Sequence, residues 1–482
     1  MDYGKMDLMD LSGATRDELL AIILQQAQLI AELRARVKAL EDQLAKDSHN
    51  SHRPPSTDPP RQRTKSLRRP SGKKPGGQPG HPGQTLCLAE QPDHVVEHRP
   101  DECASCGTSL TGVASSEVER RQIIDLPPLR LEVTEHQVHR ICCPKCDQTS
   151  SGLFPVDVAQ LIQYGPRVQA LVVYLLVYQL LPYDRTQQML SDLFGQAPSP
   201  GTLGTVVERC ADRLAETEGL IKQSIIKAEV VHFDESGLKI EGDLRWLHTA
   251  GTPKLTFYAT HPKRGKVATD ELDILPRFSG YAIHDGWRAY LTYRDCRHGL
   301  CNAHHLRELV FLEEQECQRW AKTMRLLLLW VKRRVDEAKQ VGQTELEAKT
   351  RQVIEQRYQR ILAAGFQQNP PPQEPRAPGK RGPPKKTKAR NMLERLKNHQ
   401  AAVLAFVYDF RVPFDNSLAE RDIRMLKLKQ KISGCFRSEH GAEAFCRIRG
   451  YLSTLRKQTL PMLAALECAL RGTPLIPALS PV

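Results

Sequence analysis

Two aspartates in this 482-residue sequence each follow a short apolar run. Asp234 lies in "EVVHFDESGLKI", and Asp285 lies in "GYAIHDGW". An unpaired charge at the end of a buried strand costs free energy, so such a carboxylate needs a partner or a turn that exposes it. Carboxylate oxygens are the ligands that hard cations such as Mg²⁺ prefer. Two aspartates at matching strand ends therefore predict a shared metal site, although an ordinary turn would also place Asp234 there.

A third acid is expected from the helix predicted in "FDNSLAERDIRMLKLKQKISGCFRS". Helical spacing places Glu420 at the head of a basic stripe formed by Arg424, Lys427 and Lys431. Metal-dependent cleavage of DNA needs an acid that holds the ion and cations that grip the phosphate backbone. The structural alternative is a capping box, in which Ser417 caps the helix and Glu420 returns the hydrogen bond. The residues alone leave both interpretations open.

Two Cys-x-x-Cys motifs predict a zinc site: Cys103 and Cys106 in "CASC", and Cys143 and Cys146 in "CCPKC". Four thiolates leave no open coordination position, so the site should be structural. Cys142 is a possible substitute ligand. The segment "LRLEVTEHQVHRI" between the motifs predicts a strand of the kind that carries the knuckles of a zinc ribbon.

The stretch "CNAHHLREL" contains a Cys-x-x-His pattern, Cys301 and His304, with Cys296 and His298 close by in the sequence. These residues could form a second zinc site. A buried strand that enters a helix is the favoured interpretation of this segment.

Composition narrows the class of protein. Lys and Arg number 69 against 56 Asp and Glu, which gives a net charge of +13 and favours a polyanionic partner such as nucleic acid. The N-terminus lacks the order of a secretory signal, and the longest apolar run, Val168 to Leu181, is too short to span a bilayer. Thirteen cysteines in such a chain predict a reducing, cytoplasmic location without a membrane partner.

The elements around these motifs suggest a multidomain α/β protein. Thr15 and Glu18 form a capping-box pattern, and apolar heptads follow it. The heptads favour a parallel coiled coil, and the alternative is a helix packed on its own chain. We expect six segments: a zipper-like helix (1–46), a disordered basic linker (47–98), a zinc-binding module (99–152), a helical region (153–222), a catalytic domain (223–435) with a helical insertion at about 310–400, and a C-terminal helical segment (436–482).

Two of these segments could contact DNA. The linker carries a basic arm that would lie along phosphates if a DNA-binding domain held it nearby. Its members are Arg61, Arg63, Lys65, Arg68, Arg69, Lys73 and Lys74. Within the helical region, Gly165-Pro166 starts an apolar helix that "LPYDR" breaks, and a later helix begins with Ser199 as its N-cap. It predicts either a helix-turn-helix or a bundle that only packs, and the bundle is favoured.

Several stretches, read in order, resemble the bacterial DDE transposases of the insertion sequence sixty-six family. They are "SHRPPSTD", "GKKPGGQPGHPG", the paired knuckles, "HFDESGLKI", "HDGWRAY", "CNAHHLREL", "VPFDNSLAERDIRMLKLKQKISGCFRS" and "GYLSTLRKQ". The resemblance implies a ribonuclease H-like catalytic domain, a zinc-binding domain and an N-terminal zipper. Its catalytic acids fall on Asp234, Asp285 and Glu420. The family commonly has two asparagines before the Leu of the last acid motif, where this chain has Asn416-Ser417.

The resemblance further implies a transposase that uses Mg²⁺ or Mn²⁺ to cleave element ends and transfer strands into target DNA. Expected partners are terminal inverted repeats, target DNA, a second protomer or higher oligomer, and accessory proteins encoded by the same element. His304 would lie beside the active site and, with the basic stripe, near DNA. The alternatives are a non-catalytic DNA-binding regulator derived from a transposase, and another ribonuclease H-like nuclease.

Overall fold

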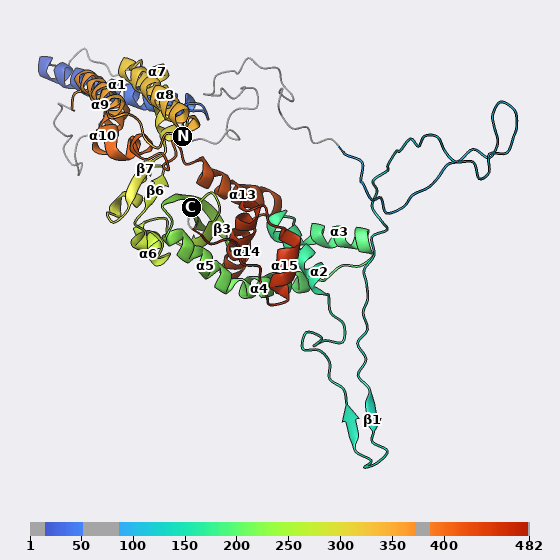
Figure 1. Ribbon diagram of the computed structural model, residues 1–482. Coiled ribbons are helices and arrows are strands. Elements are labelled where there is room, and N and C mark those ends of the chain that lie inside the picture. Colours follow the sequence, from blue (N-terminus) through green and yellow to red (C-terminus); the bar gives the residue numbers. More distant parts are fainter. Residues whose placement is uncertain (1–14, 52–85, 372–385, 481–482) are drawn as a thin grey trace. The chain divides into compact units, whose positions relative to one another are not determined.

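The computed structural model describes residues 15–51, 86–371 and 386–480 (Figure 1). These residues form two compact units. The larger unit takes its described residues from 15–51, 160–188, 198–371 and 386–480, and the smaller unit from 86–159 and 189–197. The basic arm predicted between Arg61 and Lys74 lies outside the described residues.

A mixed five-stranded sheet lies at the centre of the larger unit, with the strand order β5-β4-β3-β6-β7. Neighbours among β3, β4 and β5 are antiparallel, whereas β6 pairs in parallel with both β3 and β7. Glu241 and Gly242 join β3 to β4 with φ values of 55° and 88°, as two-residue hairpin turns require. The strands are β3 (Val230–Ile240), β4 (Asp243–Gly251), β5 (Thr256–His261), β6 (Tyr281–His284) and β7 (Arg297–Leu300).

Two C-terminal helices pack on this sheet. Helix α13 (Ser417–Ser433) contacts β3 and β4, and α14 (Glu439–Lys457) contacts β5. The buried hydroxyl of Thr454 accepts a hydrogen bond from the backbone N–H of Thr256 (3.0 Å). The hydroxyl of Tyr258 donates to the backbone carbonyl of Asp422 (2.8 Å). These contacts fix α14 and α13, the helix that carries Glu420, against β5 of the same sheet.

Helices before the sheet form a packed layer with α14 and α15. As predicted, α2 begins with Gly165 as the N-cap and Pro166 in its first turn, and the Ser199 side chain caps α4 through the Thr202 N–H (3.2 Å). The break comes slightly before the predicted "LPYDR": a π-helical turn (Tyr174–Tyr178) is followed by Leu180 at a φ of 62°, and Tyr183 already begins α3. Residues 153–165, which we expected to be helical, contain no helix. The helices are α2 (Pro166–Val173), α3 (Tyr183–Phe194), α4 (Pro200–Arg213), α5 (Ala215–Ile226) and α15 (Met462–Leu470).

A helical segment separates β7 from α13, and its apolar core continues into the sheet at Ile283 and Leu300. Its largest buried side chains include Trp320 and Tyr358, and its helices gather next to β7 (Figure 1). This arrangement matches the helical insertion predicted between the second and third acids. The helices are α7 (Asn302–Gln315), α8 (Arg319–Gln340), α9 (Ala348–Gln368), α10 (Lys388–Asn398), α11 (Gln400–Val403) and α12 (Ala405–Tyr408).

Helix α1 (Arg16–Leu44) begins with the predicted capping box between Thr15 and Glu18. It has no buried residue, and the apolar side chains of its heptads are about half exposed, for example Ile30 at 50% and Val37 at 53%. The coiled coil therefore stays a prediction. Among the described residues, no helix combines the length and apolar character that crossing a bilayer requires.

In the smaller unit, β1 (Arg140–Cys142) pairs with β2 (Thr149–Ser151) as an antiparallel hairpin. The strand predicted over "LRLEVTEHQVHRI" is wrong for most of its length, because only its last residues enter β1. The alternating pattern is present, but a strand needs a neighbour that accepts its backbone hydrogen bonds. Within the described residues, only Gly152 donates a backbone hydrogen bond to this stretch, to the His139 carbonyl (3.2 Å), and 129–138 have no strand neighbour.

Candidate active site and zinc module

Asp234 and Asp285 lie at the same level on neighbouring parallel strands. Strand β3 pairs with β6 from Val230 opposite Tyr281 to His232 opposite Ile283, and the same register continued places Asp234 opposite Asp285. Asp285 directly follows β6, as predicted. The prediction that Asp234 ends its strand is wrong, because β3 runs on to Ile240 and pairs with β4 along that length. The pairing of β3 with β6 ends after His232. Both carboxylates therefore lie where these two strands separate.

The site around Asp234 concentrates negative charge. Burial, together with the carboxylates of Glu235, Asp285 and Glu420, raises the pKa of Asp234 to about 8, against a smaller opposing effect of its hydrogen bond from the Glu235 N–H. Burial is the largest cause of this shift, and the three neighbouring carboxylates add repulsion to it. A divalent cation would relieve this repulsion, and all the donor atoms are oxygens, which suits Mg²⁺ or Mn²⁺. The chemistry of these residues fits a hard metal ion, but the carboxylates of Asp234, Asp285 and Glu420 do not meet within 4.8 Å of one another.

Glu420 lies in the first turn of α13, but the predicted capping box is wrong. The N-cap is Asn416 rather than Ser417, and its side chain makes no capping hydrogen bond. Asn416 is 1% exposed, and its amide joins β3 instead. Its Nδ2 donates to the Phe233 carbonyl (2.8 Å), and its Oδ1 accepts from Nδ1 of His232 (2.8 Å). Tertiary contacts thus take the side chain that would otherwise cap the helix.

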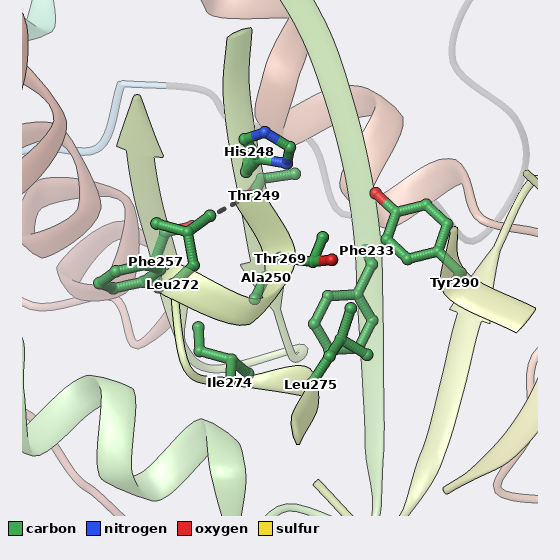
Figure 2. Close-up of a pocket in the computed structure, with 10 residues that line it drawn as sticks. All are labelled: Phe233, His248, Thr249, Ala250, Phe257, Thr269, Leu272, Ile274, Leu275 and Tyr290. Atoms are coloured by element: carbon green, nitrogen blue, oxygen red, sulfur yellow. Dashed lines mark hydrogen bonds between the residues drawn. The ribbon is translucent and has the colours of Figure 1, made fainter. Parts of the chain in front are cut away.

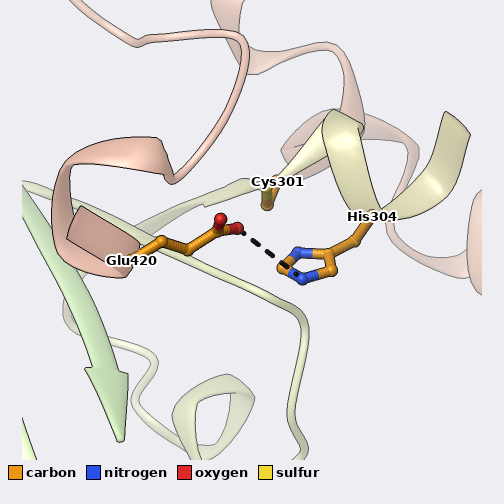
Figure 3. A group of neighbouring side chains, drawn as sticks. All are labelled: Cys301, His304 and Glu420. Carbon is orange, nitrogen blue, oxygen red and sulfur yellow. Dashed lines mark ion pairs between the residues drawn. The ribbon is translucent and has the colours of Figure 1, made fainter. Parts of the chain in front are cut away.

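Glu420 also meets the Cys-x-x-His segment (Figure 3). Cys301 is the N-cap of α7, after β7, which confirms the predicted strand that enters a helix. The Cys301 sulfur accepts a hydrogen bond from the Asn416 N–H (3.1 Å), and Nε2 of His304 lies 3.7 Å from a carboxylate oxygen of Glu420. His304 therefore contacts the third acid directly.

Cys301, His304 and Glu420 are the only three potential metal ligands whose donor atoms meet within 4.8 Å in the described parts of the chain. Glu420 thus contributes to the raised pKa of Asp234, but the Glu420 carboxylate itself lies beside Cys301 and His304. Cys296 and His298 do not join this group. The Cys296 thiol contacts the carbonyl of Tyr293, and His298 lies between that carbonyl and His284.

The predicted basic stripe follows the exposed side of α13. Arg424 is 70% exposed, with a guanidinium nitrogen 3.9 Å from the Glu420 carboxylate. Lys427 and Lys431 are exposed further along the helix. The stripe therefore begins beside the third acid and continues away from it.

A small cavity lies next to the sheet and is lined in part by Phe233 (Figure 2). It has a volume of about 20 Å³, and Tyr290 and Phe257 are among the residues that line it. This volume holds about one water molecule, so the cavity does not accept a substrate.

Sequence reasoning missed a cluster around Glu235, the residue after Asp234. Arg264 and the hydroxyl of Tyr290 both contact the Glu235 carboxylate, and the indoles of Trp246 and Trp287 flank the Arg264 guanidinium. The only signal in the sequence was the second acid in "FDES", which does not reveal a partner 29 residues away.

The two Cys-x-x-Cys motifs of the smaller unit have the same backbone geometry. In each, the N–H of the first cysteine donates to the carbonyl five residues later, from Cys103 to Thr108 and from Cys143 to Gln148 (both 2.9 Å). In each, the carbonyl of the same cysteine accepts from a residue at positive φ, Gly107 or Asp147. Both turns therefore form knuckles with their thiols on one side.

The thiols are paired within each knuckle. A hydrogen bond from the Thr108 hydroxyl lowers the pKa of Cys106, and backbone N–H groups at Lys145 and Cys146 lower that of Cys143. Each knuckle thus favours a thiolate, the form that binds Zn²⁺. The four thiols of Cys103, Cys106, Cys143 and Cys146 do not come together within 4.8 Å as described here, so the complete ligand set stays a prediction.

Sequence comparisons identify a zinc-finger module and then the family to which the chain belongs. A zinc-finger module matches residues 100–147, described as the zinc-finger binding domain of transposase IS66. The description "Transposase IS66 family" matches residues 162–444, more than half of the chain, and a family of unknown function matches residues 10–86. No curated protein matches the chain. This chain belongs to the IS66 transposase family, as its motifs predicted, and its zinc-finger module supports a structural zinc site and DNA binding.

Proposed function

We propose that this transposase cleaves phosphodiester bonds at the ends of its element and joins them to target DNA, with Asp234, Asp285 and Glu420 as its metal-binding acids. The observation that carries the proposal is the position of Asp234 opposite Asp285, with Glu420 near enough to raise the pKa of Asp234. Divalent ions bound there would activate the attacking oxygen and stabilise the leaving oxygen.

The chain's own residues hold and orient the substrate in this proposal. The carboxylates of Asp234 and Asp285 fix the position of the ions, and Glu420 completes the ligand set after its side chain leaves His304. The exposed cations of α13 would lie along the phosphate backbone beside the site. We infer a ribonuclease H-like catalytic domain over residues 223–435, and the mixed sheet with a helical insertion after β7 supports this inference.

The remaining segments have supporting roles. We propose that one Zn²⁺ bound by the paired knuckles stabilises the module over residues 99–152, which contributes to recognition of the terminal repeats. The half-exposed apolar heptads of α1 support a zipper that pairs two protomers, with accessory proteins of the same element as further partners.

Cleavage of labelled element-end DNA by the full-length protein tests the proposal. Asp234→Asn and Asp285→Asn should each lower the cleavage rate by about a hundredfold or more, because each removes a charged metal ligand. DNA binding without metal should persist in both variants. Glu394→Gln is a matched control, because Glu394 pairs with Lys386 and Arg390 in the helical insertion. Full cleavage by Asp234→Asn would refute the assignment and favour a non-catalytic or differently built site.

A further inference from the structure

Glu235 is a buried carboxylate that the three-acid site does not use. Its side chain is 2% exposed, although it directly follows Asp234. One of its oxygens accepts hydrogen bonds from Nε and Nη2 of Arg264 (2.9 and 2.7 Å), and the other accepts from the hydroxyl of Tyr290. A buried charge of this kind is retained only with well-placed partners, and here both partners are in place.

Arg264 is held by two indole rings as well as by the carboxylate of Glu235. Its guanidinium carbon lies 4.4 Å from the ring centre of Trp287 and 5.0 Å from that of Trp246. Stacking on aromatic faces and an ion pair to a carboxylate restrict the guanidinium to one orientation. An arginine that only neutralised Glu235 would not need two indoles to orient it.

The same guanidinium keeps donors available to a ligand. The Arg264 side chain is 40% exposed. Only Nε and Nη2 have hydrogen-bond partners among the described residues, so Nη1 and one N–H of Nη2 remain for an acceptor. An exposed, pre-oriented guanidinium edge matches the geometry of phosphate oxygens.

The cluster is attached to both segments that carry the aspartates. Glu235 follows Asp234 in β3, and Trp287 lies two residues after Asp285, whose carboxylate accepts a hydrogen bond from the Trp287 N–H (2.8 Å). Successive side chains of a strand point to opposite faces, so Glu235 alone does not bring Arg264 next to Asp234. The link runs through Trp287, which stacks on the guanidinium and binds Asp285, and a DNA strand bound at Asp285 would reach the Arg264 guanidinium along it.

We propose that Arg264 binds a backbone phosphate of the DNA strand at the Asp234–Asp285 site, and that Glu235, Trp246 and Trp287 act as positioning residues that orient it. This inference rests on the proposed function and adds a phosphate-binding position to it. The bond is a charge-assisted hydrogen bond without covalent chemistry. This hydrogen bond fixes the distance between the acids and the DNA strand, so its loss should lower the rate of cleavage as well as the affinity for DNA.

The test uses full-length protein, element-end DNA and three variants: Arg264→Ala, Arg264→Lys and Arg277→Ala. Arg277 is the matched control, since it is a similarly exposed arginine paired with Asp273. Affinity is measured without divalent metal over a series of salt concentrations, and cleavage is then measured with Mg²⁺. Arg264→Ala should reduce the slope of log affinity against log salt by about one, which is the contribution of one phosphate contact. Arg264→Lys should retain that slope but cleave about tenfold or more slowly, because an ammonium cannot reproduce the planar fork.

The outcomes separate this inference from the proposed function. If Arg264→Ala keeps both the salt slope and the cleavage rate of Arg277→Ala, Arg264 only balances the charge of Glu235 and the inference fails. If the alanine variant does not fold, the lysine variant decides, and wild-type cleavage by it would overturn the inference. Full activity of Asp234→Asn in the same assay would instead overturn the proposed function, whatever Arg264 does.

Discussion

The amide of Asn416 donates to the backbone carbonyl of Phe233 across 2.8 Å, and this bond ties the start of α13 to β3. Phe233 immediately precedes Asp234, and Glu420 lies one helical turn after Asn416. The same asparagine receives a hydrogen bond from His232 and donates its backbone N–H to Cys301. One buried residue therefore links three segments of the candidate site.

Asn416→Ala should impair cleavage more than it impairs folding. The change leaves the Phe233 carbonyl and His232 without buried partners, which costs roughly 1–3 kcal/mol of stability. It also frees the first turn of α13, so we expect a cleavage rate lower by about tenfold or more. Asn369→Ala is the control, because Asn369 makes comparable hydrogen bonds in the helical insertion. Equal cleavage rates for two equally destabilised variants would contradict the linking role of Asn416.

Zinc binding should depend on both knuckles. Cys103→Ser and Cys143→Ser each remove one thiolate, so the purified full-length protein should lose about one zinc ion per chain, measured by atomic absorption. Cys435→Ser, an exposed cysteine in the larger unit, should retain the metal. Because the metal organises the module, the knuckle variants should also bind element-end DNA more weakly. Wild-type zinc content in Cys103→Ser would exclude the four-cysteine site.

The contribution of the buried histidines to stability should decrease as the pH falls from about 6.5 towards 4, while Asp234, whose pKa is raised to about 8, should add stability over the same range. Burial lowers the pKa of His232 and of His248 to about 4, from an ordinary value of 6.5. Between these values the two histidines bind more protons in the unfolded chain than in the folded chain, so acid favours unfolding through them. Each histidine should cost about 3 kcal/mol by pH 4. Urea unfolding across this window should show a shallower pH dependence for His248→Gln than for wild type, whereas the exposed His440→Gln should follow wild type.

The basic stripe on α13 should contribute sequence-independent affinity for DNA. Lys427→Ala should weaken binding to element ends and to unrelated DNA by the same factor, and should lower the salt slope by about one. The reason is that a phosphate contact carries no information about base sequence. Lys349→Ala, an exposed lysine on α9, serves as the control. A loss confined to element-end DNA would mean that Lys427 reads bases instead.

Local sequence patterns predicted the ends of elements only where local contacts determine them. Thr15 and Ser199 cap their helices as expected, because a cap needs only the next helical turn. Ser417 does not cap α13, because it is the first residue of the helix and the N-cap is Asn416, whose side chain is used for contacts with β3. The apolar run before Asp234 correctly predicted a strand. Its true length depended on the antiparallel pairing with β4, which the run itself does not reveal.

In the candidate site, too, the sequence predicted some residues and missed others. Asp234 and Asp285 could be predicted because an acid after an apolar strand is unusual, and their strands proved to be neighbours. The resemblance to the family added Glu420 and indicated His304 beside it. Arg264 and its two tryptophans carried no recognisable spacing, because their contacts form only when β4, the loop after β5 and the loop after β6 come together.

The most direct test of the central claim is movement of a marked element with its native ends and accessory genes in cells. Wild type is compared with Glu420→Gln and with the control Glu394→Gln, all expressed to equal levels. The proposed three-acid site predicts movement with wild type and with Glu394→Gln, and none with Glu420→Gln. Undiminished movement with Glu420→Gln would contradict the role of Glu420 as the third metal-binding acid.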